Sequence, residues 1–407
     1  MSLPADIVCL SHLRWDFVYQ RPNHLMARAA RAHRVFFVEE PEQRGQGTRI
    51  EARSVDGVTV VKPLLPDGAS ETLATALLRD ALDRFMASEG ITSPWLWYYT
   101  PMALPWSAHV RASAIVYDCM DELSGFRFAP PKIRDYERRL IQRADVVFTG
   151  GRSLYEAKRD HHPSTFCFPS SVDMAHFSQA RGRTAEPADQ AGIGRPRIGY
   201  FGVIDERLDL GLLEHVADAR PGWRLVMVGP VAKISDADLP RRDNIHWLGL
   251  KSYAELPAYL AGWDVAMMPF AINESTRHIS PTKTPEYLAG GRPVVSTPIH
   301  DVVHPYGDEG LVHIASTAEE FERAIGAALA SDRQELLSRA DRFLVSQSWD
   351  ATWAQMERLV EERAPRRAQR WPVGGQRVSV PVAASPAQAA GASGSGGSGI
   401  SPRSVRK

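Results

Sequence analysis

Short hydrophobic segments alternate with helical patterns along most of this chain, and this alternation restricts the possible folds more than any other feature. The segment at 6–10 is typical of a strand, and a helix opens near Pro22, because proline suits a first helical turn. Similar segments are RVFFVEE, GVTVVKP, PWLWYYT, SAIVYD and DVVFTG, with helical patterns at 70–88, 131–143 and 152–159. Strands that alternate with helices predict a parallel sheet covered on both faces, and hence an α/β protein.

The alternation starts again after a polar stretch. Residues 179–195 contain glycine, proline and mixed charges, as linkers do, and RIGYFGVI begins a second series of strands and helices. We therefore expect a Rossmann-like N-terminal domain over 1–178, a linker over 179–195 and a Rossmann-like C-terminal domain over 196–346. The segments ADVVFTG and WDVAMMPF echo one another weakly, which hints at two similar domains.

A tryptophan-rich segment, WDATWAQMERLVEER, ends the second series. Its apolar residues recur at helical spacing, so we predict a helix over 347–363 that packs back toward the N-terminal domain. Beyond it, the segment 364–407 is basic, has no acidic residue and is rich in proline, alanine, glycine and serine. Such a composition cannot bury enough apolar surface to offset its ordering entropy, so we predict a disordered tail.

Composition excludes several classes of protein. The net charge is +0 and 44% of the residues are hydrophobic, so neither a fully disordered chain nor a strongly basic nucleic-acid binder is favoured. Cys9, Cys119 and Cys167 have neither the number of a disulfide framework nor the spacing of a zinc site. We find no apolar stretch of ~18 residues and no signal peptide, which favours a cytoplasmic location.

The segment HISPTKTPEYLAGGRPVVST (278–297) is the clearest candidate for a binding site. Thr284 can serve as the N-cap of a helix and Pro285 as its first residue, and the free amides there suit a phosphate. Lys283 adds a cation at the helix start, and Glu286 could accept hydrogen bonds from sugar hydroxyls. The alternative is that Glu286 is an ordinary helix-start residue and Lys283 is solvated.

A second candidate is GYFGVIDERLDLGLL. Its strand ends at Gly202, where a backbone can approach a ligand closely, and Arg207 could hold a diphosphate through paired donors. An exposed charged turn is the alternative. The glycines do not form the G-x-G-x-x-G pattern, so a nicotinamide site is not supported.

A third candidate follows the strand SAIVY. Asp118, Asp121 and Glu122 crowd its end, and carboxylates brought together raise one another's pKa, which suits general-base work. The alternative is that they are turn and helix-cap acids. A fourth candidate is the loop at 11–25, where Trp15 offers an aromatic platform for a sugar or lipid-linked acceptor, or is a core residue.

Together these segments resemble glycosyltransferases of the GT-B fold, of the family 4/family 1 type, including the teichuronic-acid biosynthesis type. SPTKTPEYLAGGRPVVST is similar to their nucleotide-binding signature, and FPSSVDMAHF resembles the interdomain segment P-N-G-V-D-x-x-x-F. QRPNHL and YDCMDE resemble N-domain motifs, and the resemblance covers 6–362. It implies two Rossmann-like domains facing a cleft, a nucleoside-diphosphate sugar as co-substrate, no other cofactor and no bound metal.

The resemblance also implies roles for single residues. Glu286 matches the second glutamate of the E-x₇-E signature, which binds the donor ribose, and Thr284 lies beside it at the helix start. Lys283 and Arg207 resemble the contacts to the donor diphosphate. Gly202 matches the glycine of the first C-domain loop.

Two departures stand out. His278 occupies the position of the first glutamate of E-x₇-E, which contacts the donor sugar or assists the reaction centre, so retaining chemistry is in doubt. Ser170 and Ser171 replace the usual N-G pair of the interdomain segment. If the reaction inverts, Asp118 or Asp121 would deprotonate the acceptor hydroxyl.

The expected function is sugar transfer from a nucleoside-diphosphate donor to a carbohydrate or lipid-linked acceptor, in cell-surface polysaccharide or glycolipid synthesis. Nucleic acid is not an expected partner. The alternatives are a nucleotide-sugar epimerase and a non-catalytic glycosyltransferase-like partner protein. The basic tail could hold the protein at an anionic membrane, at the inner face, or be a solubilising appendage.

Overall fold

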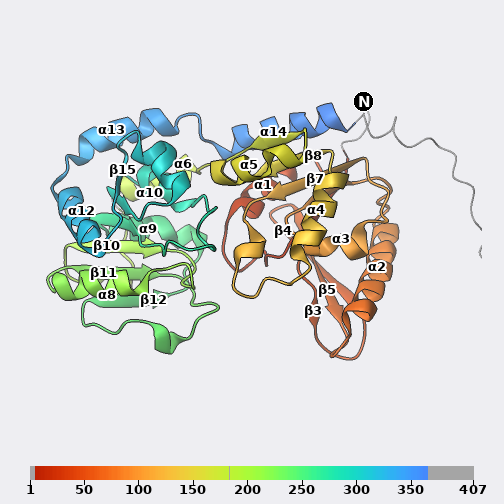
Figure 1. Ribbon diagram of the computed structural model, residues 1–407, viewed down its shortest axis with the longest axis horizontal. Coiled ribbons are helices and arrows are strands. Elements are labelled where there is room, and N and C mark those ends of the chain that lie inside the picture. Colours follow the sequence, from red (N-terminus) through yellow and green to blue (C-terminus); the bar gives the residue numbers. More distant parts are fainter. Residues whose placement is uncertain (1–4, 183, 365–407) are drawn as a thin grey trace, which may run out of the picture. The chain divides into compact units, whose positions relative to one another are not determined.

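The computed structural model describes residues 5–182 and 184–364, which belong to one compact unit. The predicted tail therefore lies, from residue 365 onward, outside the described residues. Two separate sheets, each flanked by helices, make up this unit (Figure 1). The predicted α/β class with two parallel-sheet halves is confirmed.

The first sheet has the strand order β3-β5-β2-β1-β6-β7-β8-β9, with β4 paired to β5. Its strands are β1 (Ile7–Leu10), β2 (Val35–Val38), β3 (Glu42–Gln43), β4 (Arg49–Val55), β5 (Val58–Leu65), β6 (Trp95–Tyr98), β7 (Ala114–Cys119), β8 (Val146–Thr149) and β9 (Thr165–Cys167). The helices of this half are α1 (Arg21–Ala29), α2 (Glu71–Ser88), α3 (Leu104–Ser107), α4 (Ile133–Arg143) and α5 (Arg152–Lys158). β1, β6, β7 and β8 are hydrophobic and buried throughout or nearly so, as strands covered on both faces must be.

The second sheet is parallel throughout, in the order β12-β11-β10-β13-β14-β15. Its strands are β10 (Arg197–Phe201), β11 (Arg224–Val228), β12 (Ile245–Gly249), β13 (Val265–Met268), β14 (Val294–Ser296) and β15 (Val312–Ile314). The helices after the first sheet are α6 (Met174–Phe177), α7 (Ala188–Ala191), α8 (Leu210–Ala219), α9 (Leu256–Ala261), α10 (Lys283–Ala289), α11 (His300–Val302), α12 (Ala318–Ala330), α13 (Arg333–Leu344) and α14 (Trp349–Arg363).

The central strands of the two sheets follow the same Rossmann order. β5-β2-β1-β6-β7-β8 and β12-β11-β10-β13-β14-β15 both read 3-2-1-4-5-6. The two segments that echo each other in sequence form β8 and β13, which are the sixth and fourth strands of their respective sheets. The echo therefore joins strands that are not equivalent, although the two halves do share their topology.

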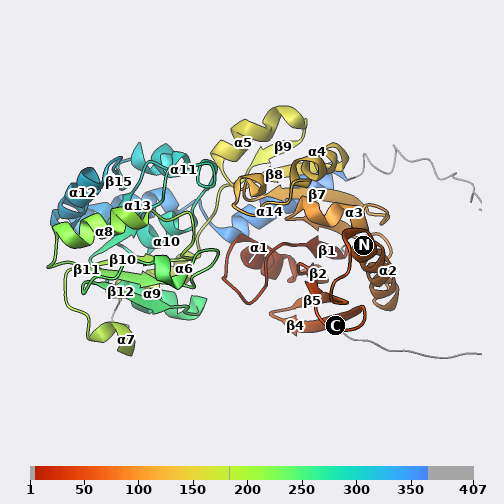
Figure 2. The same cartoon turned by 60° about the horizontal axis from the view of Figure 1, so that its bottom comes forward.

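The chain returns to the first half in α14, which Figures 1 and 2 draw in blue beside α1. Trp349, Trp353, Met356 and Val360 are buried in the same hydrophobic cluster as the inner strands β1, β6 and β7. The rings of Trp97 in β6 and Trp353 have centroids 5.6 Å apart. The apolar face of this helix is thus a packing face on the first sheet.

The strand β4 was not predicted from the sequence. It pairs antiparallel with β5 through a tight turn at Asp56 and Gly57, whose φ angles are 51° and 81°. Two successive residues with positive φ are typical of a type I′ hairpin turn, and Asp-Gly is a favoured sequence for it. β4 is mostly exposed, so it lacks the hydrophobic signature that marked the other strands.

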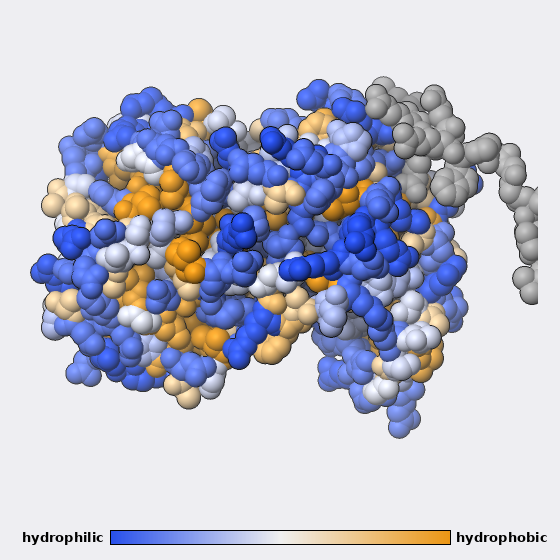
Figure 3. Space-filling model, viewed as in Figure 1, coloured by the Kyte–Doolittle hydropathy of each residue, from blue (hydrophilic) through white to orange (hydrophobic). Residues whose placement is uncertain are grey.

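The surface in Figure 3 mixes hydrophilic residues with small hydrophobic groups. Such a mixture is ordinary for a folded protein, because apolar atoms always contribute part of the accessible surface. Within the described ranges, no helix combines the length and the apolar character needed to cross a bilayer.

Candidate active site

Two neighbouring pockets open where the carboxyl ends of strands from both sheets meet. The larger has a volume of about 560 Å³ and the smaller about 90 Å³. Gln20, Arg207, Thr282 and Lys283 line both, so the two pockets form one continuous site. In parallel α/β sheets, ligands bind beyond the carboxyl ends of the strands, near the point where the strand order reverses. β10 and β13 flank that point in the second sheet.

Glycines after β10 and β11 let the backbone approach the pocket closely. Gly202 has a φ of 141° and Gly229 one of 145°, a region that disfavours other residues. A Cβ atom on Gly202 would lie 2.2 Å from Cε of Lys283, and one on Gly229 would lie 1.8 Å from the Gly202 carbonyl oxygen. The space that a side chain at position 202 would fill is occupied by the Lys283 side chain, and the close approach of Gly202 to a ligand stays a prediction.

The helix α10 begins at Lys283, with Thr282 before it, so the predicted N-cap at Thr284 is wrong. Pro285 sits at the third helical position, which is still within the first turn, where its missing N–H would have no helical partner. The Thr284 side chain is fully buried, with Oγ1 3.4 Å from Sδ of Met268, and it lines neither pocket. Since α10 has only 7 residues, we attribute anion attraction to the cationic side chains rather than to the helix end.

Lys283 and Glu286 have no hydrogen-bond or ion-pair partner in the part of the chain that the structure describes. Among the described residues, no hydrogen bond or ion pair reaches the Lys283 ammonium, which lies 5.6 Å from the ring centroid of Tyr200. The Glu286 side chain lines the larger pocket, only 6% of the residue is exposed, and its carboxylate likewise has no such partner in the described chain.

Burial shifts the pKa of each group in the direction that favours its neutral form. It lowers the pKa of Lys283, with help from the nearby positive charge of Arg207, and it raises the pKa of Glu286 against the attraction of Lys283. Two side chains of opposite charge that line one pocket, with no partner among the described residues, are both available to pair with a ligand there.

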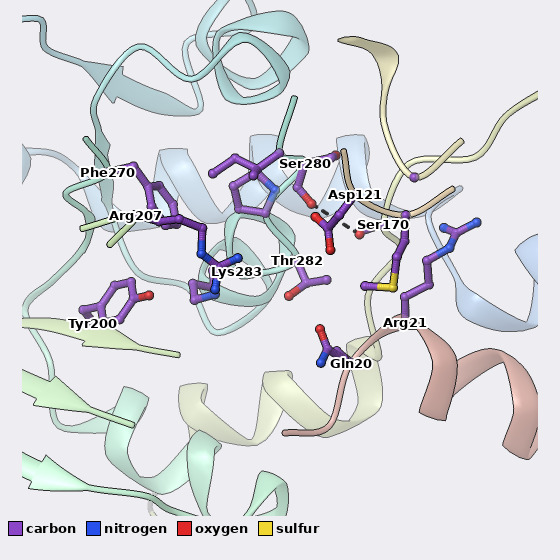
Figure 4. Close-up of a pocket in the computed structure, with 14 residues that line it drawn as sticks. Gln20, Arg21, Asp121, Ser170, Tyr200, Arg207, Phe270, Ser280, Thr282 and Lys283 are labelled. Carbon is purple, nitrogen blue, oxygen red and sulfur yellow. Dashed lines mark hydrogen bonds between the residues drawn. The ribbon is translucent and has the colours of Figure 1, made fainter. Parts of the chain in front are cut away.

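Arg207 is held in place by a neighbouring carboxylate. Its Nε and Nη2 donate to Asp205 at 2.9 and 2.7 Å, and Asp205 is 2% exposed. A bidentate pair of this kind fixes the plane of the guanidinium. Nη1 makes no hydrogen bond to a described residue, and in Figure 4 the guanidinium lies beside the Lys283 side chain. The sequence placed both cations at one site, and the structure brings them together.

Asp121 faces these cations from the first half. It lines the smaller pocket, and in Figure 4 its carboxylate lies above Thr282, on the side of the pocket across from Lys283. Burial raises its pKa to about 6, against the opposing effect of cations that include Arg207 and Lys283. The carboxylate is thus ionised at neutral pH, with a basicity suited to accepting a proton.

Asp118 cannot act as the predicted base. It lies inside β7 with no exposed surface, and its carboxylate pairs with the Arg21 guanidinium at 2.9 Å. Arg21 also donates to the carbonyl oxygen of Phe168 at 2.7 Å, and in Figure 4 its guanidinium points away from the pocket. The pair ties the start of α1 to the sheet, so Asp118 is a structural residue.

His278 does not join the other predicted site residues. It lines neither pocket, it is half-buried, and burial lowers its pKa. Its Nδ1 atom is buried with no hydrogen-bond partner among the described residues. The position that carries a glutamate in the E-x₇-E signature therefore lies outside the lining of the two pockets in this chain.

Aromatic residues from both halves border the larger pocket. Trp15 and Tyr19 both line it, and Trp15 also packs on Phe37 with ring centroids 5.0 Å apart, so it is a core residue as well. Tyr253 lines the same pocket but was missed from the sequence. It follows β12, and the rule that ligands bind beyond strand ends would have pointed to it.

Comparison with known proteins identifies the second half. Residues 195–331 match the family model described as glycosyl transferases group 1. The chain carries a glycosyl transferase group 1 domain. This match covers the second sheet together with Gly202, Arg207, Lys283 and Glu286.

A relative from Bacillus subtilis (strain 168), named as a teichuronic acid biosynthesis glycosyltransferase, TuaH, is 28% identical over 221 residues. That match covers 50% of this chain and 55% of the relative, so the chain spans little more than half of its length.

Solved structures of GT-B type share the fold. A sucrose-phosphate synthase from Thermosynechococcus elongatus matches with a TM-score of 0.66 and 15% identity, over 88% of this chain and 99% of that one. The HepE protein of Anabaena, solved with UDP and glucose, matches with a TM-score of 0.62 and 15% identity, over 88% and 100%.

Proposed function

We propose that this protein transfers a sugar from a nucleoside-diphosphate sugar to a hydroxyl group of a carbohydrate or lipid-linked acceptor, in the synthesis of a cell-surface polysaccharide or glycolipid. The observation that carries the proposal is the unpaired cation and carboxylate, Lys283 and Glu286, in one pocket. A nucleoside diphosphate offers phosphate oxygens to the first and ribose hydroxyls to the second, so one ligand pairs with both.

The two cations then have a catalytic role. When the bond between the sugar and the diphosphate breaks, negative charge develops on the leaving phosphate, and Lys283 and Arg207 stand ready to stabilise it. Because Asp205 holds the Arg207 guanidinium in place before the reaction, Arg207 needs no reorganisation as the charge forms. We propose on this basis that transfer is metal-independent, and we expect the rate to be unchanged in the presence of EDTA.

Asp121 completes the reaction if the sugar configuration inverts. As the acceptor oxygen bonds to the anomeric carbon and the diphosphate leaves, the acceptor proton passes to the Asp121 carboxylate. The placement of Asp121 on the first half, opposite the cations of the second half, supports this role. The acceptor would then approach from the first half and the donor from the second.

A two-stage experiment tests the function. Thermal unfolding is first measured with UDP, ADP, GDP and CDP and with their sugars, since a bound ligand raises the melting temperature by mass action. The sugar that binds is then incubated with and without hydroxyl acceptors. We expect a glycosylated acceptor and a free nucleoside diphosphate. An altered sugar without acceptor would instead support an epimerase, and no binding at all would support a non-catalytic protein; the comparisons favour neither.

The location of the protein is a separate proposal. We propose a cytoplasmic protein held at the inner face of the membrane by its basic tail, where each basic residue close to an anionic surface contributes about 1 kcal/mol. Truncation after Glu362 should abolish sedimentation with anionic vesicles. Equal sedimentation of the truncated and full chains would contradict membrane attachment and leave a solubilising appendage.

A further inference from the structure

The wall of the larger pocket includes a third residue, Tyr253, whose polar group has no partner among the described residues. The hydroxyl oxygen of Tyr253 is buried and forms no hydrogen bond with any described residue. Tyr253 and Glu286 both line this pocket, and they interact electrostatically. A buried hydroxyl that loses its water without gaining another partner costs stability, so its place in a pocket wall indicates a ligand.

The Tyr253 ring is fixed by its neighbours rather than free to seek a partner elsewhere. Tyr19 stacks on it with ring centroids 4.5 Å apart, and His176 stacks at 4.2 Å. The His176 ring also bonds through Nε2 to the Tyr253 carbonyl oxygen at 2.9 Å. The ring is therefore positioned before any ligand arrives, and the direction of its hydroxyl group is set by the protein.

The two polar groups have complementary hydrogen-bonding capacity. Burial and the nearby Glu286 raise the pKa of Tyr253, so its hydroxyl keeps its proton and can donate. An ionised Glu286 carboxylate can only accept. A vicinal diol both donates and accepts through each hydroxyl, so it can satisfy both side chains at once. Lys283, one helical turn from Glu286, would then meet a phosphate attached to the same ligand.

We propose that Tyr253 is a specificity-determining residue that, with Glu286, binds the ribose diol of the donor and so selects ribonucleoside over deoxyribonucleoside diphosphates. This inference rests on the proposed function, because it assumes that a nucleoside diphosphate occupies the pocket. It adds a contact from the loop after β12 to those from α10. Since Tyr19 comes from the first half, the selecting side chain is held in position by both halves.

The test uses Tyr253→Phe in the full-length protein. This change removes the hydroxyl group and keeps the ring between Tyr19 and His176. Affinities are measured by calorimetry for whichever of UDP, ADP, GDP and CDP binds wild type most tightly, and for its 2′-deoxy and 3′-deoxy forms. We expect the variant to bind the ribonucleotide about tenfold more weakly, and to lose less than twofold for at least one deoxy form. Such a pattern assigns the contact to that ribose hydroxyl.

A matched control is Tyr306→Phe, which removes a buried hydroxyl that pairs with Gln347 in the same half, away from both pockets. It should leave all three affinities unchanged. Wild-type affinity in Tyr253→Phe, or an equal loss for every nucleotide, would overturn the role of Tyr253 while the proposed function stands. Failure of wild type to bind any of the four ribonucleotides would overturn the proposed function itself.

Discussion

The two halves share a strand order, but they differ in how fully their buried charged side chains are paired. In the first half, Asp118 pairs with Arg21 at 2.9 Å, and Lys158 lies between Glu122 and Glu137 at 2.6 and 2.7 Å. In the second half, the first turn of α10 carries Lys283 and Glu286, which have no hydrogen-bond or ion-pair partner among the described residues. Paired charges hold elements together, whereas unpaired charges are available to a ligand.

The position of the candidate site follows the unpaired charges rather than the strand order, which both halves share. A buried ion pair that uses all the donors and acceptors of both side chains has none left for a substrate, whereas Arg207 pairs with Asp205 and still has Nη1 without a partner among the described residues. Unpaired groups in a pocket lower the stability of the free protein, and that cost is accepted where a ligand later pairs with them. Substitutions in the first half should therefore mainly change stability, and substitutions in the second half should mainly change binding. Asp121 is the exception, since it faces the second half.

The largest expected effect follows from Asp121→Asn. Removing the proton acceptor should lower the turnover number about 10²- to 10⁴-fold, without lowering the melting temperature. In wild type, kcat/KM should fall as pH drops below the Asp121 pKa of about 6, because the carboxyl group becomes protonated. A transfer assay over pH 4.5–8 measures both effects.

The control for Asp121→Asn is Asp135→Asn, a surface carboxylate of the same half that pairs with Arg138. It should leave the rate unchanged. An unchanged rate in Asp121→Asn would remove Asp121 from the mechanism and leave the first half with a purely structural role.

The next largest effect is on stability, from Asp118→Asn. This change leaves the buried Arg21 charge without its carboxylate, which should lower the free energy of unfolding by about 3–5 kcal/mol. Urea denaturation measures the loss. If Asp118→Asn cost less than Glu286→Gln, the contrast between paired and unpaired charges would fail.

A smaller effect is expected from Gly202→Ala. The new methyl group would meet Cε of Lys283 at 2.2 Å, so the flexible lysine must move and its contact with a phosphate is lost. We expect affinity for the nucleoside diphosphate to fall about tenfold, which corresponds to one charge-assisted hydrogen bond. Gly326→Ala in α12, where a Cβ meets open space, should leave affinity unchanged in the same titration. Equal affinities of Gly202→Ala and Gly326→Ala would show that Lys283 does not contact the ligand.

The smallest effect is the pH dependence of stability at Glu286. Because burial raises its pKa above the ordinary 4.5, the folded state binds this proton more tightly than the unfolded state. The unfolding free energy of wild type should therefore fall relative to Glu286→Gln as pH rises above 4.5. If the unfolding free energies of wild type and Glu286→Gln ran parallel from pH 4 to 8, burial would not destabilise the ionised carboxylate.

Most of the fold was predictable because its strands are buried on both faces and read as hydrophobic segments. The exposed β4 carries no such signal, and only the Asp56-Gly57 pair marks its turn. The start of α10 was misplaced by the expectation that Pro285 opens the helix, since proline is also tolerated later in the first turn.

The site was predictable where local sequence sets the chemistry and not where distant contacts do. Lys283, Arg207 and Gly202 follow strands, and the structure brings them together. Asp118 was misread because its partner, Arg21, lies far away in the chain, and spacing cannot reveal such a pair. The position of Tyr253 after β12 was a signal that the sequence offered, but its unpaired hydroxyl group shows only in the packed structure.

The central claim is that Lys283 remains unpaired in the free protein because it binds the diphosphate of a nucleotide donor. Calorimetric titration of wild type, Lys283→Met and Lys132→Met with UDP, ADP, GDP and CDP tests it most directly. We predict that at least one nucleotide binds wild type and Lys132→Met equally. The same nucleotide should bind Lys283→Met at least about tenfold more weakly, although the unfolding free energy of Lys283→Met is not lower than that of wild type. Equal affinity of all three proteins, or no binding by wild type, would contradict the claim.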